Sequence, residues 1–170
     1  GWTILARGTI SLEGDARLRE GVLYAAKGVV LADDASFQGQ ILSARSLEIH
    51  ERARLVGPAV ALCWSADSGR VVLDGSAVSN AYLVSLGASG RVEIGRDATL
   101  EGVVVSNGTL RVDGRVHGVA VASSFRCGRG EDDCAGQGVF DRTRLPVDFA
   151  VPVGLPGAKG LRVVSWESVE

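Results

Sequence analysis

The sequence predicts an all-β protein, a single-stranded parallel β-helix (a β-solenoid) of about six short coils. Two observations predict this fold. Short runs in which valine, isoleucine and leucine alternate with polar residues end at glycine or another small residue, which is typical of strands separated by tight turns. The same pattern also recurs at a nearly constant step. A repeat of about 20 residues cannot bury its own apolar side, whereas stacked copies can.

Each copy begins with two apolar residues two positions apart, and the first members of successive pairs are 19, 18, 24, 21 and 18 residues apart. These pairs are Ile10/Leu12, Val29/Leu31, Leu47/Ile49, Val71/Leu73, Val92/Ile94 and Leu110/Val112. A turn and a third, mostly apolar residue follow, at Leu18, Phe37, Leu55, Ser79, Leu100 and Val116. The last feature that the copies share is a small residue, at Ala25, Ser43, Ala61, Ser85, Ser106 and Ala122. Small side chains are expected where the interior of a coil narrows.

The third residue is followed by a glycine or alanine, at Gly21, Gly39, Gly57, Ala81, Gly102 and Gly118. The resulting phrase, apolar-x-Gly-x-apolar-x-Ala/Ser, resembles the bactofilin family from about Thr9 to Ser123. That resemblance implies a bacterial polymer-forming cytoskeletal protein. The segments Ile94–Thr99 and Leu100–Gly102 also resemble the hexapeptide repeats of β-helix acyltransferases. Steps of 19 and 21 residues do not keep a six-residue period.

The predicted solenoid occupies residues 9–123, between an N-terminal cap at residues 1–8 and a C-terminal cap at residues 124–170. We expect Trp2 to lie over the first coil. The C-terminal cap is expected to hold a cysteine-flanked loop and a β-hairpin, because Val147, Phe149, Val151 and Val153 alternate with other residues and a glycine-bounded turn follows. Capped ends oppose strand pairing between molecules, so the sequence predicts a monomer or small oligomer.

One insertion marks a candidate binding face. The extra residues of the fourth copy are expected at Cys63–Gly69, where Trp64, Asp67 and Ser68 form a possible binding-face loop. The alternative for Trp64 is a ring folded back over its own coil. A smaller insertion at Leu86–Ser89 belongs to the next copy, and the two are expected to form one surface feature because equivalent positions stack.

The three cysteines bear on the compartment. A disulfide between Cys127 and Cys134 is predicted, because a short glycine-rich loop separates them. Structural disulfides persist mainly outside the cytosol, so this bond predicts an extracytoplasmic location, at the cell surface or in the periplasm. The alternatives are two reduced thiols in a cytoplasmic protein or, third, a zinc site. Cys63 lies in an apolar run and is expected to be a buried thiol.

The motifs of enzyme chemistry are missing from the sequence. It contains no nucleophile elbow, P-loop, dinucleotide fingerprint or metal-ligand spacing, so no catalytic residue, cofactor or metal is expected. His117 is the one enzymatic hint, since acyltransferases with hexapeptide repeats use a histidine base; it is expected to point outward without a residue to orient it. The net charge of −2 and pI near 5.7 disfavour a nucleic-acid partner without excluding it.

The sequence therefore predicts a non-enzymatic structural or interaction module with protein partners. The first hypothesis is a module of an extracytoplasmic bacterial surface appendage or secretion apparatus, similar to a minor pilin. The alternatives are a bactofilin-like cytoskeletal scaffold that polymerises end to end and, third, an acyltransferase. Contact with a membrane is expected only through a segment outside this chain, because no apolar run approaches about 20 residues.

Overall fold

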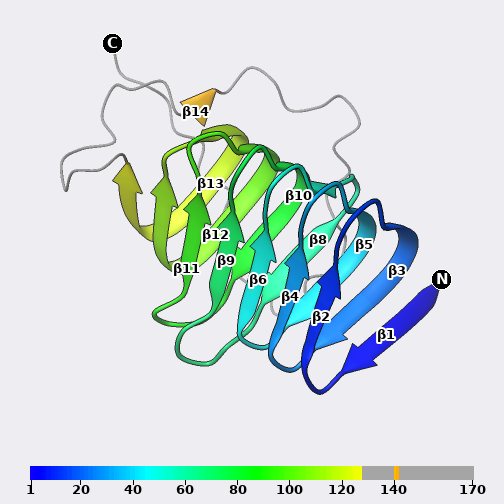
Figure 1. The fold of residues 1–170 in the computed structure, drawn as a ribbon. Helices are drawn as coiled ribbons and strands as arrows, with labels where there is room; N and C mark the ends of the chain where they lie inside the picture. The colour runs from blue at the N-terminus through cyan, green and yellow to red at the C-terminus, as the bar shows by residue number, and fades with distance from the viewer. Residues whose placement is uncertain (128–139, 142–170) are drawn as a thin grey trace, which may run out of the picture.

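The computed structural model confirms the predicted β-solenoid and describes residues 1–127 and 140–141. The described residues form parallel strands wound into about seven stacked turns, without a helix. Figure 1 shows the coils succeeding one another along the rod, with β2, β4, β6, β9 and β11 side by side on one of its sides. No helix long and apolar enough to span a membrane occurs in the described part of the chain.

The strands follow the predicted alternation closely. Their bounds are β1 Trp2–Ala6, β2 Thr9–Leu12, β3 Arg17–Ala25, β4 Gly28–Leu31, β5 Ser36–Ser43, β6 Ser46–Ile49, β7 Arg54–Leu55, β8 Val60–Cys63, β9 Arg70–Leu73, β10 Val78–Ser85, β11 Arg91–Ile94, β12 Thr99–Val112, β13 Arg115–Cys127 and β14 Phe140–Asp141.

In-register pairing places equivalent residues above one another. The first apolar residues of the copies form one column, with Ile10 opposite Val29, Val29 opposite Leu47, and so on to Val92 opposite Leu110. The residues of this column from Val29 to Leu110 are completely buried. Alternation therefore directs one side chain of each pair of neighbours into a common core, as the repeat predicted.

The stacking extends beyond the six predicted copies at both ends. At the N-terminal end, β1 pairs with β3, so the residues expected to cap the rod contribute a strand to its first coil. Trp2 lies over Gly21, as expected, and its indole Nε1 donates a hydrogen bond to the carbonyl of Arg19 at 2.8 Å. At the other end, Ser124–Cys127 continues β13 and pairs with Thr109–Val112. The predicted hairpin lies outside the described residues.

The predicted register is wrong in one coil. Ala61 was expected among the small residues, but it lies opposite Ile41 and Leu83, and Cys63 takes the small position opposite Ser43 and Ser85. The cause is Gly57–Pro58, which separates β7 from β8. Compared with the neighbouring coils, two additional residues precede the point where strand pairing resumes. Proline cannot donate to the sheet ladder and so interrupts a strand. Only part of the insertion expected at Cys63–Gly69 is therefore there.

We name the corrected set of stacked small residues the small-residue column: Ala25, Ser43, Cys63, Ser85, Ser106 and Ala122. Four of its members also satisfy backbone carbonyls where the chain turns. The hydroxyl of Ser43 donates to the carbonyl of Ser46 at 2.6 Å, and that of Ser85 to Gly69 at 3.0 Å. The thiol of Cys63 points to the carbonyl of Arg45 at 3.1 Å. Ser106, the fourth, donates to the carbonyls of Gly90 and Thr109, so the polar members of the column are both small and able to donate.

Glycines mark the bend within the long strands. Gly39, Gly102 and Gly118 adopt φ angles of 143°, 150° and 149°, a region that side-chain-bearing residues rarely occupy. A Cβ atom on Gly39 would also collide with the backbone of Gly21 in the coil below. The bend separates two sides of the rod, so each long strand contributes to both.

The small-residue column generates a prediction about packing. Replacing Ser85 with leucine adds bulk to a completely buried position and removes the hydrogen bond to Gly69. Overpacking and the lost hydrogen bond should together lower the free energy of unfolding by about 2–4 kcal/mol, measured by urea denaturation.

Ser79→Leu is the matched control. Ser79 is also completely buried, but its hydroxyl has no partner among the described residues, and its strand neighbours are Leu55 and Leu100. We expect a smaller loss or a gain in stability. Equal losses in the two variants would contradict the assignment of the small-residue column.

Candidate functional site

The predicted binding-face loop lies on the surface, and its three residues have different surroundings. Asp67 and Ser68 are exposed, whereas Trp64 is half-buried. The Trp64 ring packs against Tyr24 of β3, with ring centroids 5.2 Å apart and planes inclined by 44°. Trp64 is therefore folded back over β3, two coils below β8, and not over its own coil as the alternative interpretation expected. Asp67 and Ser68 remain the accessible part of the loop.

The two insertions stack on one another. The backbone amide of Ser89 donates to the carbonyl of Asp67 at 2.8 Å, and that of Ala88 donates to the carbonyl of Ala66 at 3.4 Å. Gly87 fits between them, because a Cβ at that position would meet the carbonyl oxygen of Ser65. The loops at residues 64–69 and 86–90 consequently form one continuous ridge, as their positions in successive copies predicted.

Beside this ridge lies an unusually apolar side of the rod. After the bend, every second side chain points into the core in the strands β3, β5, β8, β10, β12 and β13. Leu23, Ile41 and Leu83 are examples. Their neighbours therefore point outward, and we name these the apolar face: Val22, Tyr24, Gln40, Leu42, Val60, Leu62, Tyr82, Val84, Val103, Val105, Val119 and Val121. Gln40 is the only side chain of this set without a large apolar group.

Burial varies along the apolar face. Val84, near its middle, is 2% exposed, whereas Val119 and Val121 on β13 are 41% and 45% exposed. Burial also raises the pKa of the Tyr82 hydroxyl. The exposed apolar side chains of this face thus lie towards its two ends, at Tyr24 on β3 and at Val119 and Val121 on β13, and exposed apolar groups that gather on a surface mark a candidate contact site. The sequence interpretation missed this face, although the signal is present as strands such as Gly102–Ser106 with valine on both sides.

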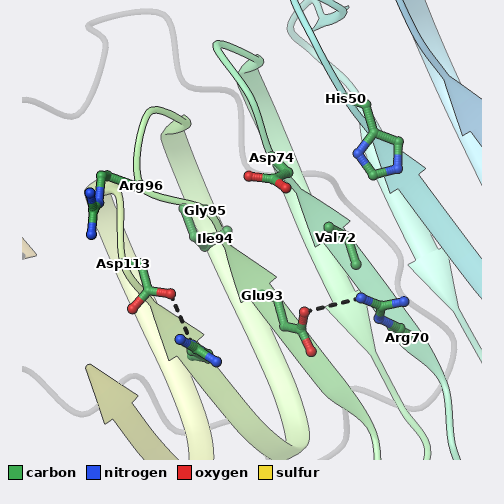
Figure 2. A pocket seen from close by; sticks show the side chains of 10 residues that line it. His50, Arg70, Val72, Asp74, Glu93, Ile94, Gly95, Arg96 and Asp113 are labelled. Carbon is green, nitrogen blue, oxygen red and sulfur yellow. Dashed lines mark hydrogen bonds and ion pairs between the residues drawn. The ribbon is translucent and has the colours of Figure 1, made fainter. Parts of the chain in front are cut away.

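A different side of the rod is polar. A shallow groove of about 310 Å³ runs along the turns that follow β6, β9, β11 and β12, and Figure 2 shows His50, Asp74 and Asp113 along it. The carboxylate of Asp74 lies where a Cβ on Gly95 would stand, so the glycine is needed for this turn to stack. Asp113 accepts a hydrogen bond from Arg111 at 2.9 Å.

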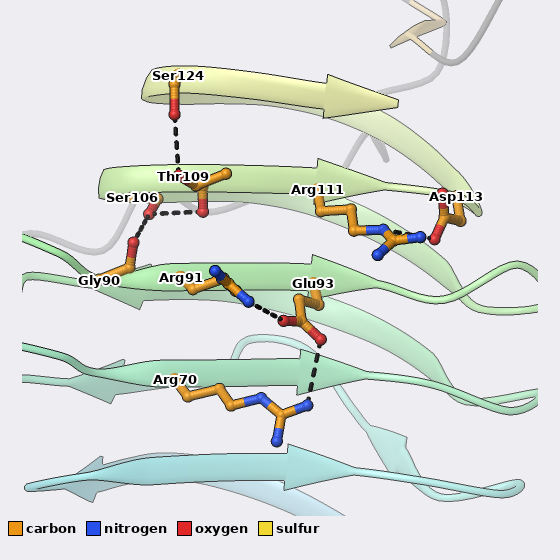
Figure 3. A network of polar contacts seen from close by, with 9 residues as sticks. All are labelled: Arg70, Gly90, Arg91, Glu93, Ser106, Thr109, Arg111, Asp113 and Ser124. Carbon is orange, nitrogen blue, oxygen red and sulfur yellow. Dashed lines mark hydrogen bonds and ion pairs between the residues drawn. The ribbon is translucent and has the colours of Figure 1, made fainter. Parts of the chain in front are cut away.

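Most of the charged side chains around this groove are paired with one another. Glu93 contacts Arg70 of the coil below at 3.2 Å and Arg91 of its own strand at 3.4 Å, and Arg111 pairs with Asp113 (Figure 3). His50 contacts Glu48 at 3.1 Å rather than either aspartate. No group of three or more histidine, cysteine or carboxylate side chains suited to a metal occurs in the described part of the chain. The groove therefore has the composition of a structural ion-pair network.

His117 lies on β13 and is partly buried. The sequence offered no residue to orient it, but the sheet register places it opposite Glu101 on β12 and opposite Asp141 on β14. Its Nδ1 atom has no hydrogen-bond partner among the described residues. Register thus places two carboxylate-bearing residues opposite His117, and within the described part of the chain its Nδ1 atom has no hydrogen bond that would orient the ring as a general base.

The cysteines divide between the described and undescribed parts of the chain. Cys63 is completely buried, as expected, and burial raises the pKa of its thiol. The predicted partner of Cys127, Cys134, lies outside the described residues, so the disulfide stays a prediction.

No protein-family model, curated protein or solved structure matches this chain. The functional argument therefore depends on the surfaces themselves.

The ion-pair network generates a prediction. Glu93→Gln removes the charge that Arg70 and Arg91 share, and we expect the free energy of unfolding to fall by less than about 1 kcal/mol. The loss should shrink in 1 M NaCl, since salt screens exposed charges.

Glu101→Gln provides the control, because it makes the same chemical change on β12 at a carboxylate that takes part in none of the ion pairs found among the described residues. Thermal and urea denaturation at low and high salt measure both variants. A gain in stability for Glu93→Gln would contradict the structural assignment, since excess unneutralised charge is a feature of binding sites.

Proposed function

We propose that this chain is a non-enzymatic structural module that assembles with protein subunits at the N-terminal end of its rod. The observation that supports this most directly is an open sheet edge. β1 and β2 terminate the sheet, and each pairs on one side only among the described strands. Their outer backbone groups are available to a further strand.

The exposed core supports the same proposal. Ile4 occupies the inward position opposite Leu23, but it is 42% exposed, whereas Leu23 is completely buried. Its exposure therefore comes from the open end rather than from the side of the rod. A second subunit stacked on β1 would bury Ile4 and extend the parallel or antiparallel ladder by one spacing of about 4.8 Å.

End-to-end assembly favours a bactofilin-like scaffold over a capped module. Capped ends were the sequence-based argument against polymerisation, and β1 provides no such cap. A module of an extracytoplasmic appendage is the second candidate, favoured by the two cysteines flanking residues 128–133. Both candidates are structural, and they differ in compartment.

The assembly proposal predicts the effect of a charge at the open end. The intact chain should form elongated oligomers at micromolar concentration, and Ile4→Lys should dissociate them, because burying an unpaired lysine between subunits is costly. Analytical ultracentrifugation and negative-stain electron microscopy measure the assemblies.

Val78→Lys is the matched control, since Val78 is 40% exposed on the outer surface of β10. It should leave assembly unchanged. A monomeric intact chain at several hundred micromolar, or equal effects of the two lysines, would refute assembly through this end.

The compartment is tested by thiol titration of the protein purified without reductant from its native source. The native chain should leave Cys63 unmodified near pH 8, because it is buried and its thiol pKa is raised. The denatured chain should then show one free thiol if Cys127 and Cys134 are joined, which supports an extracytoplasmic module. Three free thiols would support the cytoplasmic scaffold instead.

A further inference from the structure

The dimensions of the apolar face restrict what can cover it. It extends over the coils from β3 to β13, and at about 4.8 Å per coil it is roughly 25 Å long. Only two outward positions of each strand belong to it, so its width is about 10 Å. The resulting area of roughly 250 Å² is well below the 800 Å² or so that each partner contributes to a stable protein interface. A narrow segment fits this face better than a second globular subunit.

The strands themselves indicate that the face is covered. β10 presents Leu83 to the core and both Tyr82 and Val84 to the outside, and β12 presents Val103 and Val105 around the buried Val104. Parallel strands that are apolar on both sides are typical of sheets covered on both sides. On the groove side, β11 lacks this property, because Arg91 and Glu93 flank the buried Val92.

We propose that the C-terminal segment of this chain, residues 142–170, lies along the apolar face. The last described strand, β14, pairs with β13 at Val116 and His117, one short step along the strand from Val119 and Val121 of the face. The 29 residues that follow can span up to about 95 Å when extended, several times the length of the face. A tethered segment also has an effective concentration near the millimolar range, which a free partner rarely reaches.

The sequence of this segment matches an apolar strip of this length. Val147, Phe149, Val151 and Val153 alternate with Asp148, Ala150 and Pro152, so an extended chain presents all four large apolar side chains on one side. Seven residues cover about 23 Å, close to the length of the face. This placement differs from a hairpin that closes the end of the rod. A segment along the apolar face would contact residues several coils below β13, whereas a hairpin at the end of the rod would not.

Photo-crosslinking distinguishes these placements. Val60 lies on β8, three coils below β13, and is replaced by p-benzoylphenylalanine in the full chain. The experiment is done in the Ile4→Lys variant, which is monomeric if the proposed assembly holds. If it does not hold, dilution distinguishes crosslinks within one chain, which persist, from crosslinks between chains, which decrease. We expect concentration-independent crosslinks to peptides from residues 142–170, identified by mass spectrometry, and none from the same probe at Val78. Crosslinks to another copy, or to no peptide of this segment, would overturn the proposal.

A second measurement uses the alternation of the segment. Phe149→Asp should release it from the face and raise the fluorescence of the apolar dye ANS several-fold. Ala150→Asp is the matched control, since it introduces the same charge on the opposite side of the predicted strand and should leave the fluorescence near that of the unaltered chain. Equal ANS fluorescence in the two variants would overturn the proposal.

Discussion

Pairing of each coil with the coil below it is the constraint on which the rest of this structure depends. A parallel ladder requires equivalent residues to meet in register, so every position in a coil inherits the geometry of the same position in its neighbours. Gly39 has no room for a side chain because the Gly21 backbone lies beneath it, and Gly95 has none because Asp74 does. Even the insertions obey this rule, since the loop after β10 hydrogen-bonds to the loop after β8.

The same constraint makes the sides of the rod different from one another. Because residues of one position stack, a preference at that position becomes a continuous stripe along the molecule. On the groove side, Arg70 and Arg91 stack at one position and Glu93 lies at the next outward position, so that Glu93 pairs with Arg70 across coils. After the bend the stripe consists of valine, leucine and tyrosine, and the result is the apolar face. The polarity of each side is thus set by a few repeated positions.

Stacking also leaves the ends chemically distinct from the sides. The described strands inside the stack pair with a strand above and a strand below, whereas β1 and β2 have a described partner on one side only. The core side chain Ile4 is exposed for the same reason. Assembly at the end of the rod and coverage of its side therefore depend on different residues of the chain.

The sequence by itself determined the fold class and nearly every stacked position, because alternation and a near-constant step are local patterns that survive without knowledge of the folded chain. It was also sufficient to place Cys63 in the interior and to expect the two insertions to meet. The sequence-based register was wrong about Ala61. The structure has two added residues at Gly57–Pro58 and four after Cys63, and together they give the same 24-residue distance between successive copies as a single insertion would. Only the pairing of β8 with β5 and β10 separates the two possibilities.

The surfaces were decided by the tertiary structure. In the sequence, Val60, Tyr82 and Val103 are single residues in apolar runs, and burial inside the core accounts for such runs equally well. Stacking places them above one another on the outside, because each adjoins a residue that already fills the core. The open end was equally invisible, since residues 2–6 read as an irregular lead-in until their pairing with β3 made them the first edge of the rod. Neighbours along the chain define a strand, but only neighbours in space define which of its sides and edges remain free.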